Sequence, residues 1–191
     1  MVKIKICGVQ TLADVDNINQ VQPDLIGFVF APSKRQIGLK TAQQLREQLN
    51  PDIISVGVYV GQTTAEIKAA LEQQIISQVQ YYGKLPNDLI QTVHNLNGEI
   101  IQVVTDKNEI NADADYVMFD ASKGRGIAAK AFTNHHLSQP EYLSGGINLT
   151  NVAEAVKTTQ PIVVDVSSST ETDGHKDLIK MQALTDLVHQ L

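Results

Sequence analysis

The sequence predicts an α/β fold: a single (β/α)8 TIM barrel domain that spans residues 1–191 and has short loops. Eight runs rich in Val, Ile, Tyr and Phe recur along the chain, bounded by Gly, Pro, Asn or Asp. Helical patterns separate most of these runs, and such crossovers make neighbouring strands parallel. The 191 residues fall short of the ~250 of a typical barrel, which leaves little length for inserted loops. An open α/β sheet with fewer strands is the alternative.

The strand candidates have the short, apolar composition of strands covered on both faces. The first, VKIKIC, ends at Cys7, the only cysteine of the chain. The last, PIVVDV, runs directly into consecutive serines. In chain order the candidates span residues 2–7, 25–30, 54–60, 76–82, 99–104, 116–120, 141–145 and 161–166.

Helical periodicity is visible between these runs. Ile67, Ala70 and Leu71 share one face of a predicted helix that a threonine precedes as an N-cap. Pro86 suits the first turn of the next helix, and Asn148 is a candidate cap further along. The helix candidates span 64–74, 86–96, 148–156 and 176–191, whereas the polar segment 106–115 is a poor helix.

Charge and composition limit the possible partners. The formal net charge is -6, and no cluster of Lys and Arg is present, so we expect no nucleic-acid partner. No apolar run approaches the ~20 residues that span a bilayer, and the N-terminus has no secretion signal. A lone cysteine forms no internal disulfide, which favours a cytoplasmic location. We therefore expect a small-molecule partner.

Two glycine- and serine-rich loops follow the seventh and eighth strand candidates. In a barrel the active site lies at the C-terminal ends of the strands, and a phosphate commonly binds at these two loops. Glycines let backbone N–H groups approach an anion, and serine hydroxyls add donors. The alternative is that the glycines only form tight turns. The candidate phosphate-binding residues are Gly145, Gly146, Ser167 and Ser168.

Three further side chains are predicted at the same end of the barrel. Cys7 and Asp120 end the first and sixth strands, where a thiolate and a carboxylic acid could act as base and acid. That role calls for a lowered thiol pKa and a raised carboxyl pKa. Arg35 follows the second strand, where its fork could bind a carboxylate. The alternatives are a buried apolar cysteine, a capping aspartate and a solvated arginine.

The sequence predicts no cofactor and no metal site. It has no zinc-type Cys/His spacing, no Walker loop and no G-x-G-x-x-G before a helix. His135 and His136 fall in a predicted helix, and the other histidines do not gather near them.

Several motifs resemble those of the phosphoribosylanthranilate isomerase family. They are KICGV, GFVFAPSKR, VGVYV, VQYYG, the strand that ends at Asp120, LSGGINLTNV and VDVSSSTETDGHKD, which run in order from residue 3 to about residue 181. The resemblance implies a (β/α)8 isomerase of tryptophan biosynthesis. Its reaction is the Amadori rearrangement of N-(5-phosphoribosyl)anthranilate to 1-(2-carboxyphenylamino)-1-deoxyribulose 5-phosphate, with no metal or organic cofactor.

The resemblance also implies roles for individual residues. In the family an aspartic acid protonates the ribose ring oxygen and the ring opens to a Schiff base. A cysteine thiolate then removes the C2′ proton, and the enolamine tautomerises to the ketone. Asp120 matches the acid, Cys7 the base and Arg35 the arginine that meets the anthranilate carboxylate. Asp165 matches an aspartate near the ribose, and the glycines and serines named above fall in the phosphate loops.

The sequence departs from the family pattern at three places. The usual Q-L-H-G is Gln80-Tyr81-Tyr82-Gly83, the glycine-rich stretch after the acid is Lys123-Gly124-Arg125-Gly126, and Ala31 replaces a frequent aromatic. Two other functions stay open: a sister isomerase of histidine biosynthesis, against which Cys7 argues, and a phosphosugar-binding barrel without turnover. The sequence does not distinguish a monomer from a homodimer.

Overall fold

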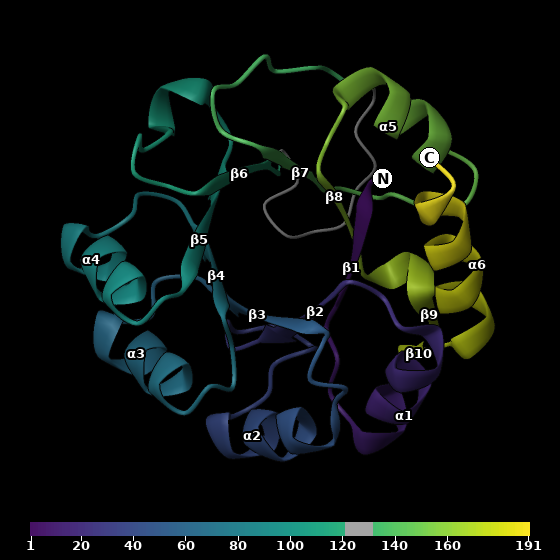
Figure 1. The fold of residues 1–191 in the computed structure, drawn as a ribbon, viewed down its shortest axis with the longest axis horizontal. Helices are drawn as coiled ribbons and strands as arrows, with labels where there is room; N and C mark the ends of the chain where they lie inside the picture. The colour runs from purple at the N-terminus through teal and green to yellow at the C-terminus, as the bar shows by residue number, and fades with distance from the viewer. Residues whose placement is uncertain (121–131) are drawn as a thin grey trace.

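The computed structural model describes residues 1–120 and 132–191 and shows a closed barrel (Figure 1). Eight parallel strands pair in chain order, and β8 returns to pair with β1. The strands are β1 (Lys3–Cys7), β2 (Leu25–Val29), β3 (Ile54–Tyr59), β4 (Gln78–Tyr82), β5 (Glu99–Val104), β6 (Tyr116–Phe119), β7 (Glu141–Leu143) and β8 (Val163–Val166). The predicted fold class is confirmed, and the alternative of an open sheet is wrong.

Helices form the outer ring around the strands (Figure 1). Within the described residues they are α1 (Leu12–Val21), α2 (Leu39–Gln48), α3 (Thr64–Glu72), α4 (Asn87–Asn95), α5 (Val152–Thr159) and α6 (Leu178–His189). After β8 the chain forms the 3₁₀ turn η2 (Ser168–Thr170) and a small hairpin of β9 (Glu171–Thr172) and β10 (His175–Lys176). None of the helices described is both long and apolar enough to cross a membrane.

The helix ends show which local predictions hold. Thr63 caps α3, and its hydroxyl and the Glu66 side chain form a reciprocal capping box. Pro86 is the N-cap of α4, one residue before the position predicted for it. The cap of α5 is Asn151 rather than Asn148, because Asn148 instead accepts hydrogen bonds from Thr150 in the preceding turn. The poor helix predicted over 106–115 is confirmed, since only the 3₁₀ turn η1 (Lys107–Glu109) forms there.

The helix predicted around His135 and His136 is wrong, because residues 132–140 contain no helix. The His135 ring stacks on Phe119 with centroids 3.7 Å apart. Its Nδ1 lies 2.8 Å from Glu141 Oε1, at the start of β7. These contacts hold His135 against the ends of β6 and β7.

Two apolar layers stabilise the barrel. Alternate strand residues such as Ile4 and Ile6 point outward and pack with the helices in the larger core. Inward-pointing residues such as Val56, Ile101 and Met118 fill the interior. The N-terminal end is closed by hydrogen-bonded polar side chains: Tyr142 OH donates to Gln78 Oε1 at 3.0 Å, and Gln78 and Tyr116 both donate to Glu99. The open cavity is therefore at the opposite end.

Two matching aspartates join strand starts to helix ends. Asp24, directly before β2, accepts the Ile4 N–H of β1 at 2.9 Å and lies 2.8 Å from His189 Nε2 at the end of α6. Asp115, directly before β6, accepts the Ile100 N–H of β5 at 2.7 Å and lies 2.9 Å from His94 Nε2 near the end of α4. Both aspartates satisfy a strand N–H that would otherwise lack a partner.

Candidate active site

A cavity of about 750 Å³ opens at the C-terminal end of the strands. This is the end at which barrel enzymes carry their active sites. All eight residues predicted for the site line this one cavity: Cys7, Arg35, Asp120, Gly145, Gly146, Asp165, Ser167 and Ser168. Closure of the barrel therefore brings together side chains that are up to 161 residues apart in the sequence.

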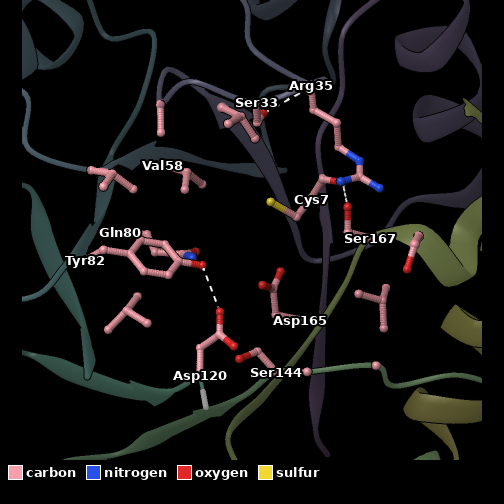
Figure 2. Close-up of a pocket in the computed structure, with 18 of the residues that line it drawn as sticks. Cys7, Ser33, Arg35, Val58, Gln80, Tyr82, Asp120, Ser144, Asp165 and Ser167 are labelled. Carbon is pink, nitrogen blue, oxygen red and sulfur yellow. Dashed lines mark hydrogen bonds between the residues drawn. The ribbon is translucent and has the colours of Figure 1, made fainter. Parts of the chain in front are cut away.

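Cys7 ends β1, and its sulfur points into the cavity (Figure 2). Two glycines make room for this arrangement. Gly27, which pairs with Cys7 in β2, leaves a gap in which a Cβ atom would lie 2.7 Å from the Cys7 sulfur. Gly8 has a φ of +87°, which favours glycine, and a Cβ there would overlap the Arg35 side chain.

Lys5 lies two residues before Cys7 on the same face of β1 and is fully buried. Its Nζ donates to Asp165 Oδ1 of β8 at 2.8 Å. Burial opposes the charge of Lys5, but Asp165 and Cys7 beside it outweigh this and raise the pKa of the ammonium. Burial also raises the pKa of Asp165, against the opposing effect of Lys5. A lysine–aspartate pair therefore lies directly under the thiol.

The predicted lowering of the thiol pKa is wrong. Burial raises the pKa of Cys7 above its ordinary value of 9.0, while Lys5 and Lys176 act in the opposite direction. Desolvation of a thiolate outweighs the attraction of these cations, because Cys7 is buried. Cys7 is consequently a neutral thiol at rest.

Asp120 follows β6 and is buried at the same cavity. Tyr82, at the end of β4, donates from its hydroxyl to Asp120 Oδ2 at 3.3 Å (Figure 2). Burial raises the pKa of Tyr82, and Asp120 adds to the effect, so the phenol keeps its proton. The departure from the family pattern at residue 82 therefore places a neutral donor on the carboxyl group predicted to be the acid.

The two predicted phosphate loops lie next to each other at the cavity. Gly145 and Gly146 have φ values of 98° and 66°, which glycine tolerates without strain. The Ser167 hydroxyl donates to the Cys7 carbonyl oxygen at 3.0 Å, so it also holds β1 against β8. Ser169 lines the cavity, and its buried hydroxyl oxygen has no hydrogen-bond partner among the described residues.

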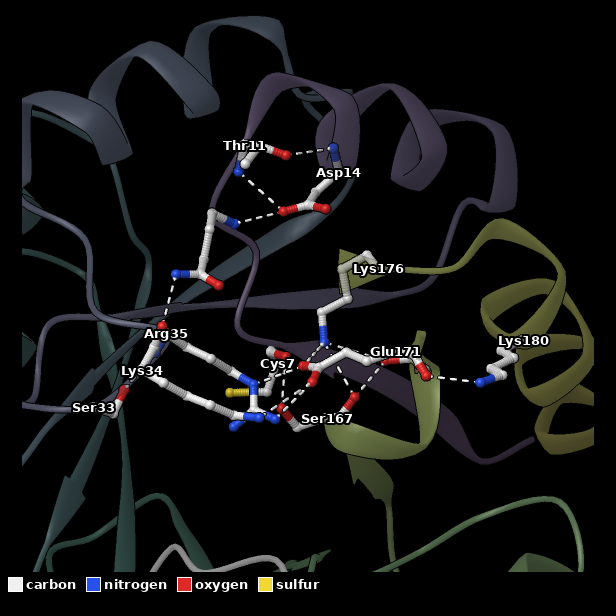
Figure 3. Close-up of polar contacts among 12 residues, drawn as sticks. Cys7, Thr11, Asp14, Ser33, Lys34, Arg35, Ser167, Glu171, Lys176 and Lys180 are labelled. Atoms are coloured by element: carbon white, nitrogen blue, oxygen red, sulfur yellow. Dashed lines mark hydrogen bonds and ion pairs between the residues drawn. The ribbon is translucent and has the colours of Figure 1, made fainter. Parts of the chain in front are cut away.

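Arg35 reaches the cavity from the loop after β2, and Glu171 of β9 holds it there (Figure 3). Its Nε and Nη2 donate to the two carboxylate oxygens of Glu171 at 2.6 and 2.8 Å. Lys176 of β10 donates to the same carboxylate at 3.1 Å and to the Ser167 carbonyl at 3.2 Å. Burial disfavours the charge of Glu171, but Arg35 and Lys176 together hold its pKa below 4.5.

Five residues of this site were not among the sequence-predicted ones: Lys5, Tyr82 as a partner of Asp120, Ser169, Glu171 and Lys176. The motifs KICGV and VDVSSSTETDGHKD contain four of them, but only the folded chain shows how they lie at the site. The altered segment 123–126 lies outside the described residues. Within residues 1–120 and 132–191, no group of three or more His, Cys, Asp or Glu side chains is placed to hold a metal ion.

Comparisons with known proteins identify the family. Residues 4–186 match the family model of N-(5'phosphoribosyl)anthranilate (PRA) isomerase. The N-(5'-phosphoribosyl)anthranilate isomerase of Lacticaseibacillus casei is 38% identical over 196 residues, covering 100% of this chain and 98% of that protein. The corresponding enzyme of Streptococcus gordonii is 36% identical, with 98% of each chain covered.

A solved structure gives the same fold. The phosphoribosylanthranilate isomerase of Thermotoga maritima superposes with a TM-score of 0.85 at 26% identity, with all of each chain covered. Together, the family model, the full-length relatives and this superposition show that the chain belongs to the N-(5'-phosphoribosyl)anthranilate isomerase family, the isomerases of tryptophan biosynthesis.

Proposed function

We propose that the chain carries out its isomerase reaction in this cavity with Asp120 as general acid and Cys7 as general base. One observation carries the assignment: a thiol and a carboxyl group from distant parts of the chain line the same cavity as a glycine-rich loop, a serine-rich loop and a half-buried arginine. A solved phosphoribosylanthranilate isomerase of the same fold, with a TM-score of 0.79 at 26% identity, binds reduced 1-(o-carboxyphenylamino)-1-deoxyribulose 5-phosphate. That complex supports a cavity suited to the open-chain product.

The proposed chemistry moves two protons in turn. Asp120 gives its proton to the ribose ring oxygen of N-(5-phosphoribosyl)anthranilate, and the C1′–O bond breaks to leave a Schiff base. The Cys7 thiolate removes the proton from C2′, and the electron pair of that bond neutralises the Schiff base as an enolamine. Tautomerisation then gives 1-(2-carboxyphenylamino)-1-deoxyribulose 5-phosphate. Acid and base steps of this kind contribute about 10²–10⁴-fold each.

The remaining predicted residues would hold the substrate. We assign the phosphate to the loops that contain Gly145, Gly146, Ser167 and Ser168, and the ribose to the neighbourhood of Asp165. We assign the anthranilate carboxylate to Arg35. Glu171 accepts from Nε and Nη2 of Arg35, so three of the five guanidinium N–H groups are left for the substrate.

Two buried polar atoms support a polar ligand in this cavity. Gln80 Oε1 and Ser169 Oγ both lie at residues that line it, and neither has a hydrogen-bond partner among the described residues. Such atoms are rare in folded proteins, because each loses its bonds to water without replacement. Hydroxyl and phosphate groups of the substrate would supply the missing partners.

The proposal needs only groups from one chain, so it holds equally for a monomer and a homodimer. It includes neither a cofactor nor a metal, and the partner is the small phosphosugar. The net charge of -6 supports the absence of a nucleic-acid partner. The unpaired cysteine supports a cytoplasmic location.

The test is a fluorescence assay for loss of phosphoribosylanthranilate, which tryptophan emission does not obscure because the chain has no tryptophan. We expect Cys7→Ala and Asp120→Asn each to lower kcat by about 10²-fold or more with little change in KM. Lys68→Gln, on the exposed surface of α3, serves as a control and should match the parent. Variants that turn over like the parent would disprove the assigned roles. A parent that binds the product analogue without turnover would identify a binding protein.

A further inference from the structure

Lys5 is a buried charged residue for which the proposed mechanism has no role. Its side chain is 0% exposed in the barrel interior, and lysine is almost never fully buried without a partner. The partner is Asp165, at 2.8 Å. A buried ion pair of this kind is weak support for a purely stabilising role, since apolar residues of similar volume often stabilise as well or better.

The geometry directs this pair toward the thiol. Lys5 and Cys7 are two residues apart in β1, so both point into the barrel, and Lys5 also pairs with Asp165 in the β1–β8 register. A Cβ placed at Gly27 would lie 2.7 Å from the Cys7 sulfur and 3.1 Å from Lys5 Nζ. The sulfur and the ammonium therefore share the gap that the missing Gly27 side chain leaves.

The gap holds fewer positive groups than groups that can become negative. One ammonium faces two groups that can ionise, the Cys7 thiol and the Asp165 carboxyl group, and Asp165 opposes ionisation of Cys7. Within residues 1–120 and 132–191, the other charged or titratable groups that act on Cys7 include Lys176 of β10, Arg35 of the β2 loop and Tyr82 of β4. Glu171 already binds Arg35 and Lys176, and Tyr82 is neutral. Of the cations that the structure describes near Cys7, Lys5 is thus the one left for a thiolate.

We propose that Lys5 is a positioning residue whose ammonium is the counter-ion for a single negative charge that moves between Cys7 and Asp165. The thiol proton passes to the Asp165 carboxylate, and the resulting thiolate then pairs with the ammonium. The inference rests on the proposed role of Cys7 as base. The S–H bond breaks and an O–H bond forms on Asp165, so the net charge of the three groups does not change. After Cys7 has taken the C2′ proton, the proton on Asp165 passes to the Asp120 carboxylate and restores the resting state.

The test measures the thiol directly, without substrate. Because Cys7 is the only cysteine and lines the cavity, the rate of its alkylation by iodoacetamide against pH reports the thiolate fraction, and Cys7→Ala gives the blank. We expect Lys5→Met to slow alkylation at neutral pH about tenfold or more, since the thiolate loses its counter-ion. We expect Asp165→Asn to accelerate it about tenfold, since the competing carboxylate is gone.

The opposite signs separate this proposal from a structural role. If the pair only supports the fold, both variants loosen the site and shift the alkylation rate in the same direction, which would overturn the proposal, as would no shift in either. Lys3→Met, at the exposed start of the same strand, controls for the loss of one positive charge and should behave like the parent.

Lys5→Met leaves the buried Asp165 carboxylate without a counter-ion, which can prevent folding. The double variant Lys5→Met/Asp165→Asn is therefore measured as well, and circular dichroism checks that each variant is folded. We expect its alkylation to be slower than that of Asp165→Asn alone; an equal rate would exclude Lys5 as the counter-ion. The alkylation rates do not depend on what Cys7 does in turnover. The kcat of Cys7→Ala tests that role separately, so the two proposals fail in distinguishable ways.

Discussion

At the scale of single residues, two glycines determine what the lone thiol can do. Gly8 turns the chain with a positive φ and leaves space for the Arg35 side chain to pass over it. Gly27 leaves space on the other side for the Cys7 sulfur and the Lys5 ammonium. The Cys7 thiol therefore lies between Arg35, which is proposed to bind the substrate, and Lys5, which is proposed to bind the thiolate.

The first prediction concerns Gly27→Ala. The added methyl group would lie 2.7 Å from the sulfur, so Cys7 has to move, and displacement of a reacting group by about 1 Å costs about 10²-fold in rate. We expect kcat to fall by that order while the circular dichroism spectrum is unchanged. Gly38→Ala is the matched control, because a Cβ there meets nothing within 4 Å. Equal kcat values for the two variants would contradict the prediction.

Tyr82→Phe tests the contact between Tyr82 and Asp120. The change removes a hydroxyl that donates to the carboxyl group at 3.3 Å and leaves the ring in place. The hydroxyl would stabilise the carboxylate that Asp120 becomes as it gives up its proton. Hydrogen bonds to charged groups are worth roughly 1.5–3 kcal/mol, so we expect kcat to fall by about 10- to 100-fold with KM nearly unchanged. Steady-state kinetics with phosphoribosylanthranilate measure both constants. A change confined to KM would mean that Tyr82 contacts the substrate rather than the acid.

Cys7 also makes stability depend on pH in the alkaline range. Its pKa in the folded state is raised above the ordinary 9.0, so its contribution is complete below pH 9 and is lost as the pH rises toward the folded-state pKa. We expect the free energy of unfolding of the parent to fall above pH 9 by up to about 1.4 kcal/mol per pH unit more than that of Cys7→Ala. Urea denaturation at several pH values gives both curves, and parallel curves would contradict the raised pKa.

The sequence predicts where the candidate catalytic side chains lie, but it does not predict the pKa of the thiol or the partner of Arg35. The positions of Cys7 and Asp120 at strand ends predict that both face the cavity, because parallel strands in a closed barrel end on one side. The direction of the thiol pKa was not predictable, since it depends on how far burial outweighs two nearby lysines. The pairing of Arg35 with Glu171 depends on a hairpin too short to be recognised from sequence.

At the scale of elements, the hairpin of β9 and β10 connects the two sides of the site. Glu171 binds Arg35 of the β2 loop and Lys176 of the same hairpin. Lys176 in turn binds the Ser167 carbonyl in the loop after β8. A single carboxylate therefore links the residue proposed for the anthranilate carboxylate to a loop proposed for the phosphate.

Glu171→Gln tests this link. Loss of the carboxylate leaves two partly buried cations without a counter-ion, and we expect the free energy of unfolding at neutral pH to fall by about 2–3 kcal/mol. The folded-state pKa of Glu171 is depressed below 4.5, so its contribution is present above pH 4.5 and is lost as the pH falls through the folded-state value. The gap between parent and variant in urea denaturation should close in acid, and a gap that persists there would contradict the assignment.

The strands were predictable from sequence to within two residues at each end, and the helices less so. Strands of a barrel are buried on both faces, so their composition alone marks them. The segment around His135 lacks helix because its side chains contact the strand ends directly: the ring stacks on Phe119 and the nitrogen binds Glu141. Such tertiary contacts override local helical preference and leave no pattern in the sequence.

At the scale of the whole molecule, closure of the sheet is the property on which the site depends. β1 pairs with β8 over four residue pairs, from Lys3 and Val163 to Ile6 and Val166. This pairing places the Cys7 carbonyl against the Ser167 hydroxyl and Lys5 against Asp165. Alternation of strands and helices predicts such a closure, but it does not reveal the side-chain pairs across the seam.

Hydrogen exchange tests the closure. Amides of β1 and β8 are hydrogen-bonded within the barrel, whereas the edge strands of an open sheet leave a row of amides unpaired. Across the β1–β8 seam the Lys3 N–H donates to the Ile162 carbonyl oxygen at 3.0 Å, and the Lys5 N–H points the same way, because successive amides of a parallel strand face alternate neighbours. We expect the amide of Lys5 to exchange as slowly as those of Val56 and Val58 in β3. Exchange of β1 at the rate of exposed loops would contradict a closed barrel.

The two aspartates that precede β2 and β6 show a duplication that is not visible in the sequence. Each binds the N–H of the second residue of the preceding strand and a histidine at the end of a helix. The strands concerned are four positions apart in an eight-stranded ring, so a half-turn about the barrel axis relates one arrangement to the other. This local link between a strand start and a helix end is thus repeated by a two-fold pseudosymmetry of the ring, although only one of the two strands that it holds carries a thiol.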